Sequence, residues 1–265
     1  MKITSFEIIV VGAPWRELTI VELQTDEGIT GVGEVRMVNK TDTLVAAIKE
    51  LGDRYVIGSD VFDLTRLAWN IDVAEYGLPG EVGRSALAAF DIACWDIMGK
   101  SLKVPIWKLL GGVFTERVPA YANGWYQGQR DPESIAKLAR GVVARGYTGL
   151  KIDPFGAASA EMSPANHRQS IEILEAVRDA VGSDVQIYVE MHGRFTAATA
   201  VAVAKDLERI GAGWIEEPVV PGDIRGLRHV RNHTHLPIAL GERIHTATEL
   251  QPFLEENLVD VVQVC

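Results

Sequence analysis

The sequence has few cysteines, no long apolar run and no excess of basic residues. Only two cysteines occur among 265 residues, Cys94 in an apolar stretch and Cys265 at the last position. A disulfide framework is therefore excluded, and a reducing, cytoplasmic location is expected. No apolar run has the length of a membrane span, and residues 1–14 are typical of a first strand, not of an export signal. The formal net charge of −10 argues against nucleic acid or an anionic membrane as a partner, because either favours a basic surface.

The organisation of the chain changes near residue 115. Before it, alternating apolar patterns predict three antiparallel strands, at residues 3–12, 18–26 and 29–35, followed by helices at 41–52, 61–74 and 83–99. A sheet followed by a helical cluster indicates an α+β domain, which we place at residues 1–112.

From residue 113 to 265 short strand-like runs alternate with helical periods, at about 25 to 30 residues per unit. The six runs predicted as strands are VPAYANGW, GLKIDPFG, VQIYVE, GWIE, PIALGE and DVVQVC. Strand and helix in alternation predict a parallel α/β domain, most economically an incomplete (β/α) TIM-like barrel with about six strands. A closed barrel has eight strands, so the sequence predicts a C-terminally truncated form.

Three glutamates follow consecutive strand-like runs at equal intervals of 26 positions, at Glu190, Glu216 and Glu242. Because the carboxyl ends of parallel barrel strands lie side by side on the face where active sites form, we expect these carboxylates to meet. Three adjacent carboxylates repel one another unless a cation lies between them, and a hard divalent ion with oxygen ligands satisfies them. The sequence therefore predicts a Mg²⁺ site, the alternative being even spacing by chance on a solvated surface.

Several motifs in register resemble the enolase superfamily, in its mandelate racemase and muconate-lactonizing branch. They are the three strand-end glutamates, Glu216-Glu217-Pro218, Gly241-Glu242, Lys151-x-Asp153 and the α+β front domain. The segment VEMHGRF is similar to that of acid-sugar dehydratases such as galactonate and galactarate dehydratases. The resemblance implies a capping front domain, a carboxylate-bound Mg²⁺, removal of the proton α to a substrate carboxylate and an enediolate intermediate. A hydro-lyase that converts a small-molecule sugar acid to a 2-keto-3-deoxy acid is thus expected.

Two residues are candidate catalytic groups. His192 lies two positions beyond Glu190, so strand alternation directs both to the barrel interior. The resemblance implies that His192 is the general acid that protonates the departing hydroxyl; the alternative is a satisfied polar residue. Lys151 closes the second barrel strand, and a nearby cation would lower its pKa. The branch commonly has Lys-x-Lys here, the second lysine being a base, whereas this chain has Asp153. Lys151 is therefore interpreted as a base or, more plausibly, a substrate-positioning charge, with a surface lysine as the alternative.

Candidate substrate-binding residues are Arg194, Asp153 and Trp15. Arg194 offers a fork-shaped donor for a carboxylate, and Asp153 is positioned to orient Lys151 or to bond a sugar hydroxyl, unless each is an ordinary surface or turn residue. The resemblance implies that the loop containing Trp15 closes over the barrel mouth, although Trp15 could instead anchor the core. Glu217 is expected to point away from the site, whereas Arg243 and His245 are weaker candidates for its lining.

The last predicted strand departs most from the family. Cys265 stands near the position where the dehydratases have an aspartate that supports a histidine base on the next strand. We therefore expect activity to belong to a complete chain. The alternatives are a non-catalytic fragment, or a racemase, epimerase or cycloisomerase of the same branch. Members of the branch often assemble through their barrel faces, which leaves a homo-oligomer open.

Overall fold

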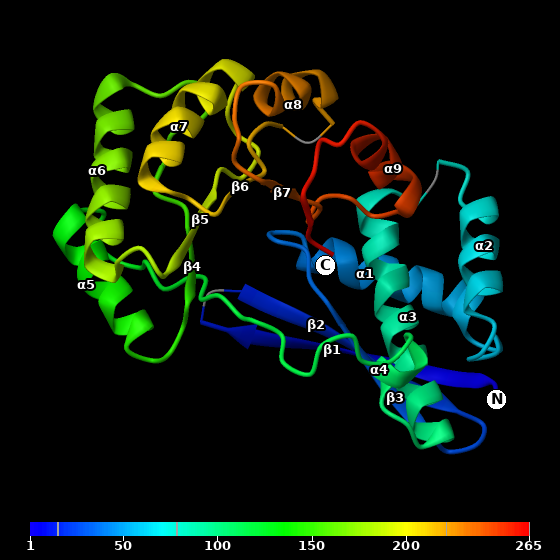
Figure 1. The fold of residues 1–265 in the computed structure, drawn as a ribbon. Coiled ribbons are helices and arrows are strands. Elements are labelled where there is room, and N and C mark those ends of the chain that lie inside the picture. The colour runs from blue at the N-terminus through cyan, green and yellow to red at the C-terminus, as the bar shows by residue number, and fades with distance from the viewer. Residues whose placement is uncertain (15, 78, 221, 265) are drawn as a thin grey trace. The chain divides into compact units, whose positions relative to one another are not determined.

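A computed structural model describes residues 1–14, 16–77, 79–220 and 222–264. The chain forms two compact units, residues 1–116 and 117–265 (Figure 1). Two residues singled out from the sequence, Trp15 and Cys265, lie outside the described residues.

The first unit contains a three-stranded antiparallel sheet, as predicted. The strands β1 (Ile3–Ala13), β2 (Arg16–Thr25) and β3 (Thr30–Val35) pair in the order β1-β2-β3. The turn between β2 and β3 uses Gly28, whose φ of 76° suits a residue without a side chain. The amide of Gly28 donates to the carbonyl of Thr25 at 3.1 Å and closes this turn.

The helices of this unit follow the sheet along the chain. They are α1 (Thr41–Leu51), continued by the π-helix Gly52–Val56, then α2 (Leu64–Ala74), α3 (Gly80–Leu102) and α4 (Ile106–Leu109). Helix α3 approaches β3 closely because Gly31 and Gly33 carry no side chain. A Cβ at Gly33 would lie 2.0 Å from the carbonyl oxygen of Ala89. The predicted helices at 41–52, 61–74 and 83–99 therefore correspond to α1, α2 and α3.

The second unit is built on a parallel sheet with the order β4-β5-β6-β7-β8. Its strands are β4 (Gly149–Ile152), β5 (Gln186–Glu190), β6 (Trp214–Glu216), β7 (Ile238–Leu240) and β8 (Val261–Val262). The register of β5 and β6 places Glu190 level with Glu216, and that of β4 and β5 places Lys151 level with Tyr188. Strand alternation then directs Lys151, Glu190 and Glu216 to the same face.

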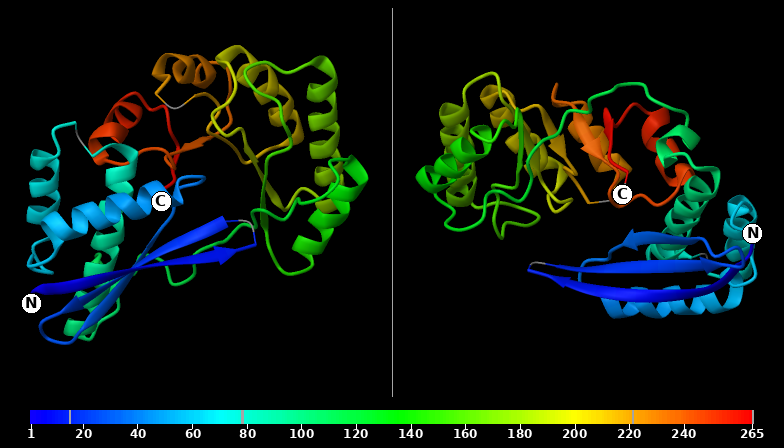
Figure 2. Two further views of the ribbon diagram at one scale, coloured as in Figure 1. Left: turned by 180° about the vertical axis from the view of Figure 1, so that it is seen from behind. Right: turned by 90° about the horizontal axis from the view of Figure 1, so that it is seen from below.

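Five helices alternate with these strands in an arc around them (Figures 1 and 2). They are α5 (Pro132–Val143), α6 (Pro164–Val181), α7 (Ala197–Ile210), α8 (Ile224–Arg231) and α9 (Ala247–Glu255). Each begins at a Ser, Thr or Asp whose side chain accepts a backbone amide of the first turn, which fixes where the helix starts. In the described part of the chain, no helix combines the length and apolarity needed to cross a membrane.

The predicted first barrel strand, residues 118–125, is not a regular strand. It contributes only a parallel bridge between Ala122 and Leu150, in which the amide of Ala122 donates to Gly149 and its carbonyl accepts from Lys151. Pro119 lacks an amide proton, and Gly124 has a φ of 70°, so the ladder does not continue in either direction. The second unit is thus a partial parallel barrel with five described strands and this bridge.

Candidate functional site

Two predicted metal ligands meet a lysine at the carboxyl ends of β4, β5 and β6. The ammonium of Lys151 lies 3.1 Å from Oε2 of Glu190 and bonds Oε1 of Glu216. Both glutamate side chains are almost wholly buried, and Lys151 is only 9 % exposed. The structure therefore brings Glu190 and Glu216 together, with a cation bridging them.

The charged groups of this cluster change one another's pKa. Burial and the neighbouring carboxylate of Glu216 raise the pKa of Glu190. Burial alone would lower the pKa of Lys151, but its hydrogen bond to Glu216 and the charges of both glutamates raise it. A lowered pKa of Lys151 requires a bound cation beside it, whereas here Lys151 lies beside two carboxylates. In this arrangement Lys151 is a cation and not a proton acceptor.

The second oxygen of Glu216 is held by donors that the sequence reasoning missed. Oε2 accepts from Nε2 of Gln263 at 2.9 Å and from the indole Nε1 of Trp214 at 3.2 Å. Beneath the carboxylates, the ring of Trp214 stacks on Tyr188 with 3.5 Å between centroids, and Tyr121 meets both rings edge-on. Tyr188 and Trp214 precede Glu190 and Glu216 by two positions, so period-2 alternation was a signal that could have found them.

The third predicted ligand, Glu242, does not join this pair. Its side chain is 30 % exposed and lies near Arg243, with 3.6 Å between carboxylate and guanidinium. Among the described residues, no group of three or more His, Cys, Asp or Glu side chains is arranged to hold a metal ion. These residues nevertheless fit Mg²⁺ in part. Two buried carboxylates already bind the same ammonium group, that of Lys151, and Mg²⁺ prefers oxygen ligands.

His192 is held by three contacts just beyond β5. Its ring Nδ1 lies 2.7 Å from Oδ2 of Asp153, and its amide donates to Oε1 of Glu190 at 2.8 Å. Its carbonyl accepts from Nη2 of Arg243 at 2.8 Å. The φ of His192 is 52°, a left-handed conformation that histidine adopts more readily than most residues. Because Asp153 engages Nδ1, the other ring nitrogen, Nε2, is the one available for proton transfer.

Asp153 contacts both His192 and Arg194. It makes no described contact with Lys151, so the prediction that it orients Lys151 is wrong. Its Oδ1 accepts the amide of Phe155 at 3.0 Å, while its Oδ2 also pairs with Arg194. Burial raises the pKa of Asp153, but the hydrogen bonds from His192 and Phe155 and the charge of Arg194 outweigh it and lower the pKa. The hydrogen bond to Asp153 raises the pKa of His192 despite burial.

The guanidinium of Arg194 bonds two groups of the protein itself. Besides Asp153, it donates to the carbonyl of Gly156 at 2.9 Å, and its side chain is 22 % exposed. A role in binding a substrate carboxylate therefore stays a prediction for Arg194.

The remaining candidates lie around the end of β7. Glu217 has a φ of 44° and is buried, and its Oε1 accepts the amide of Gly241 at 3.2 Å. It lines a cavity of about 390 Å³ together with residues that include Leu227, Leu240, Arg243 and Phe253. Burial raises the pKa of Glu217. The amide of His245 donates to Oε2 of Glu249 at 2.8 Å, and its Nδ1 lies 3.5 Å from the same oxygen, so His245 contacts the helix that follows it.

An antiparallel α+β unit followed by a parallel α/β unit with acidic strand ends defines a class of enzymes that act at the carboxyl ends of barrel strands. Residues 6–111 match the mandelate racemase / muconate lactonizing enzyme N-terminal domain, and residues 134–265 match the enolase C-terminal domain-like family. The chain therefore belongs to the mandelate racemase / muconate lactonizing enzyme family of the enolase superfamily.

Characterised relatives include several sugar-acid dehydratases. The chain is 39 % identical to D-gluconate dehydratase of Thermoproteus tenax over 95 % of its own length and 51 % of that protein. It is 33 % identical to D-galactonate dehydratase of Ralstonia pickettii over 99 % of its length and 67 % of that protein. An N-succinyl-L-Arg/Lys racemase of Bacillus cereus is 29 % identical over the whole chain and 72 % of that protein. The chain thus spans about half of the first relative and about two thirds of the second.

Solved structures share the fold closely. A mandelate racemase/muconate lactonizing enzyme-like protein from Roseovarius sp. TM1035 superposes with a TM-score of 0.93 and 30 % identity, over 99 % of this chain and 71 % of that one. A member of the enolase superfamily from Salmonella Typhimurium gives a TM-score of 0.92 at 30 % identity, over 99 % and 73 % of the two chains.

Proposed function

We propose that the chain supplies the active site of a Mg²⁺-dependent sugar-acid dehydratase, forming a 2-keto-3-deoxy acid through an enediolate intermediate. The observation that carries this proposal is the imidazole of His192, held by Asp153 beside the buried pair Glu190 and Glu216. Dehydration differs from racemisation in that a hydroxyl must leave, and its departure requires a proton donor on that side. The relatives named D-gluconate and D-galactonate dehydratases support the same class of substrate.

The residues proposed to hold Mg²⁺ are Glu190, Glu216 and Glu242. The first two already lie together, and Glu242 follows the next strand of the sheet. When bound, Mg²⁺ supplies positive charge that stabilises the negative charge developing on the substrate as its α proton leaves. Lys151 is proposed to add a second cation, which faces the substrate carboxylate and positions it.

His192 is proposed to complete the elimination. A base other than His192 and Lys151 takes the α proton. The imidazolium of His192 then donates its Nε2 proton to the departing β-hydroxyl, so that the C–O bond breaks and water leaves. The carbon skeleton becomes an enol, which tautomerises to the 2-keto-3-deoxy acid. The raised pKa of His192 favours the protonated ring near neutral pH, and Asp153 fixes its orientation. Arg194, which shares Asp153, is proposed to contact the substrate, and Trp15 is proposed as a further substrate-binding residue.

The test is product formation from D-gluconate and D-galactonate with Mg²⁺ by a complete chain that contains these residues, followed as 2-keto acid by semicarbazone absorbance. His192→Asn is expected to lower this rate by about 10² to 10⁴, because it removes the general acid. It should retain exchange of the substrate α proton with deuterium from solvent, a step that precedes loss of the hydroxyl.

His167→Asn is the matched control, because His167 pairs with Asp206 and lies outside the cluster. It should behave as the unaltered chain in both assays. Equal losses of water elimination in the two variants would remove His192 from the catalytic role, and no 2-keto product from any sugar acid would refute dehydration by this chain.

A further inference from the structure

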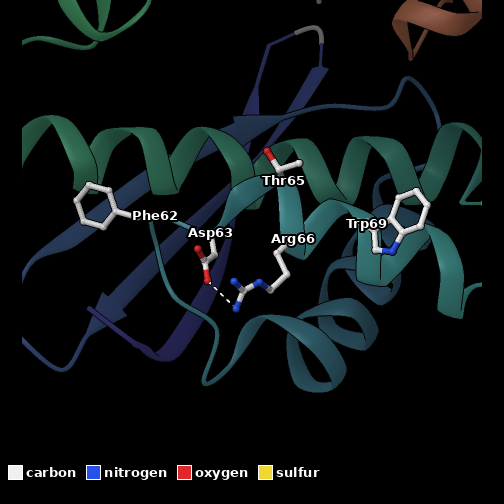
Figure 3. Close-up of a pocket in the computed structure, with 5 residues that line it drawn as sticks. All are labelled: Phe62, Asp63, Thr65, Arg66 and Trp69. Atoms are coloured by element: carbon white, nitrogen blue, oxygen red, sulfur yellow. Dashed lines mark ion pairs between the residues drawn. The ribbon is translucent and has the colours of Figure 1, made fainter.

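A pair of histidines on the surface of the second unit leaves ring nitrogens open to a ligand. The contrast is a hollow of about 500 Å³ in the first unit, which is lined by Phe62, Asp63, Thr65, Arg66 and Trp69 (Figure 3). There Oδ2 of Asp63 lies 3.1 Å from Nη1 of Arg66, so the two charged groups satisfy each other. The histidines, His229 and His233 at the end of α8, are exposed and do not satisfy each other in this way.

His229 and His233 are four positions apart on one helical path. The path of α8 continues past its last residue, because the amide of Asn232 donates to the carbonyl of Arg228 at 3.1 Å. The amide of His233 likewise donates to the carbonyl of Val230 at 2.9 Å. Side chains four positions apart on a helix are neighbours, and the centroids of the two imidazole rings lie 4.2 Å apart.

The ring of His233 is held in the tautomer that binds a metal ion. Its Nδ1 lies 2.7 Å from the carbonyl oxygen of His229. A carbonyl oxygen only accepts, so Nδ1 carries the proton and donates it, and Nε2 of the neutral ring keeps its lone pair. A histidine that binds a metal ordinarily has one ring nitrogen on the ion and donates from the other to a carbonyl or carboxylate. This supporting hydrogen bond is already formed at His233.

The ring of His229 supplies the second nitrogen. Within the described part of the chain this ring makes no hydrogen bond, and its side chain is exposed, so it is free to rotate. A bound Zn²⁺ lies about 2.0–2.1 Å from each histidine nitrogen. Rings whose centroids are 4.2 Å apart are close enough for one ion to contact both after a rotation of His229.

The two arginines next to the pair along the chain are neutralised by carboxylates. Arg228 binds both carboxylate oxygens of Glu256, with 2.6 Å between Nη2 and Oε1, and Arg231 pairs with Asp260. The carboxyl end of a helix also carries partial negative charge, which favours a cation there. The surroundings of the pair therefore do not oppose a divalent ion.

We propose that His229 and His233 bind a divalent metal ion of the Zn²⁺, Ni²⁺ and Cu²⁺ class, at a site separate from the proposed Mg²⁺ site. Imidazole suits these ions, whereas Mg²⁺ prefers oxygen ligands. Among the residues that the structure describes, no group of three or more His, Cys, Asp or Glu forms a fuller metal site here. Water therefore fills the remaining coordination positions, and the bound ion links the end of α8 to the segment that leads to β7.

The test is a Zn²⁺ titration of the 265-residue chain in excess Mg²⁺, followed by proton NMR of the imidazole resonances. Among the six histidines, His229 and His233 should respond at the lowest Zn²⁺ concentration, and Mg²⁺ alone should leave both unmoved. His229→Gln and His233→Gln identify the two resonances. Each should weaken Zn²⁺ binding by at least about tenfold, the loss seen even when a group supporting a ligand is removed. Both should also reduce the rise of the thermal unfolding midpoint with Zn²⁺.

His235→Gln is the matched control, because His235 is exposed in the same segment and its amide donates to Oε1 of Glu208 at 2.6 Å. It should bind Zn²⁺ as the unaltered chain does, and all three variants should keep their unfolding midpoint in chelator. An equal loss of binding in His235→Gln would overturn the assignment to the pair. Resonances of His229 and His233 that stay unmoved at about 1 mM Zn²⁺, which half fills even a site with a millimolar dissociation constant, would refute the proposal.

Discussion

The ends of β6 and β7 carry the same residue type at the same 26-residue interval, yet their surroundings differ. Glu216 is sealed from solvent and bonded by Lys151, Trp214 and Gln263. Glu242 is 30 % exposed, and its carboxylate lies 3.6 Å from the guanidinium of Arg243. A cavity of about 390 Å³ is lined by residues that follow both strands, among them Glu217 after β6 and Arg243 after β7. The position at a strand end therefore places the backbone of each glutamate, whereas buried hydrogen-bond donors hold its carboxylate in one position.

The largest effect is expected from Lys151→Met, which removes the cation on the sealed side. Without added metal, two buried carboxylates then lose their counter-charge, and we expect the free energy of unfolding to fall by about 3–5 kcal/mol. Urea denaturation measures it. Lys137→Met, at an exposed position of α5, should change stability by no more than about 0.5 kcal/mol. Equal losses in the two variants would show that the buried ammonium does not stabilise the fold.

Measuring both Mg²⁺ affinity and metal-free stability distinguishes the glutamate after β6 from the one after β7. Glu216→Gln and Glu242→Gln should each weaken Mg²⁺ binding by at least about 10–100-fold, the loss seen even when a group supporting a ligand is removed. Only Glu216→Gln should also lower metal-free stability, by about 1–3 kcal/mol, because its partners are buried. Titration calorimetry and urea curves give the two quantities. Unchanged affinity in Glu242→Gln would remove that residue from the ligand set, and unchanged affinity in Glu216→Gln would reject the site.

A pH effect is expected from Asp153, on the β4 side. Its lowered pKa means that its stabilisation is present above its ordinary pKa and is lost as pH falls through the lowered value. The raised pKa of His192 means that its share is present below its ordinary pKa and is lost as pH rises through the raised value. Asp153→Asn should therefore cost most stability between these limits, about 1 kcal/mol, because the half-exposed imidazole is screened.

The same variant should lower the pKa of His192, which proton NMR of the imidazole resonances reports directly. Asp206→Asn, beside His167, is a matched control that alters another histidine–aspartate pair and should leave the His192 resonance unmoved. An unaltered His192 pKa in Asp153→Asn would show that the contact does not hold the ring.

The smallest effect is expected at Glu217, near β7. Its pKa is raised by burial, so the ionised form is disfavoured in the folded chain and stability falls as pH rises above the ordinary glutamate pKa. Glu217→Gln keeps an acceptor for the amide of Gly241 and removes this penalty. We expect a gain of up to about 1 kcal/mol at pH 8 and little change at pH 4. A loss of stability at pH 8 would show that the carboxylate is paired in a way that a neutral amide cannot replace.

The sequence predicted the backbone of the site better than its contacts. Parallel strands with acids at their ends follow from period-2 alternation and unit length, and these placed Glu190 and Glu216 correctly beside each other. The antiparallel sheet and the helices of the first unit were equally predictable, because alternation and helical periods are local signals. The expected strand at 118–125 failed because Pro119 and Gly124 interrupt a run whose composition otherwise suits a strand.

Side-chain partners beyond the strand ends were not predictable. Lys151 between the two glutamates, Asp153 between His192 and Arg194, and Gln263 on Glu216 are contacts between residues up to 65 positions apart. The left-handed φ of His192 is likewise set by tertiary contacts, since local propensity makes it uncommon outside glycine. The exposure of Glu242 was not predictable either, because its equal spacing along the chain implied the same buried environment as that of Glu216.

The fluorescence of Trp214, whose ring stacks on Tyr188, also reports on the buried carboxylate of Glu216. The indole N–H of Trp214 bonds Glu216, and its ring lies 3.5 Å from that of Tyr188. A change in the charge or position of this carboxylate therefore alters the electric field at an indole fluorophore. The emission wavelength of Trp214 becomes an intrinsic record of what Glu216 binds, and Trp214→Phe identifies its share of the signal from six tryptophans.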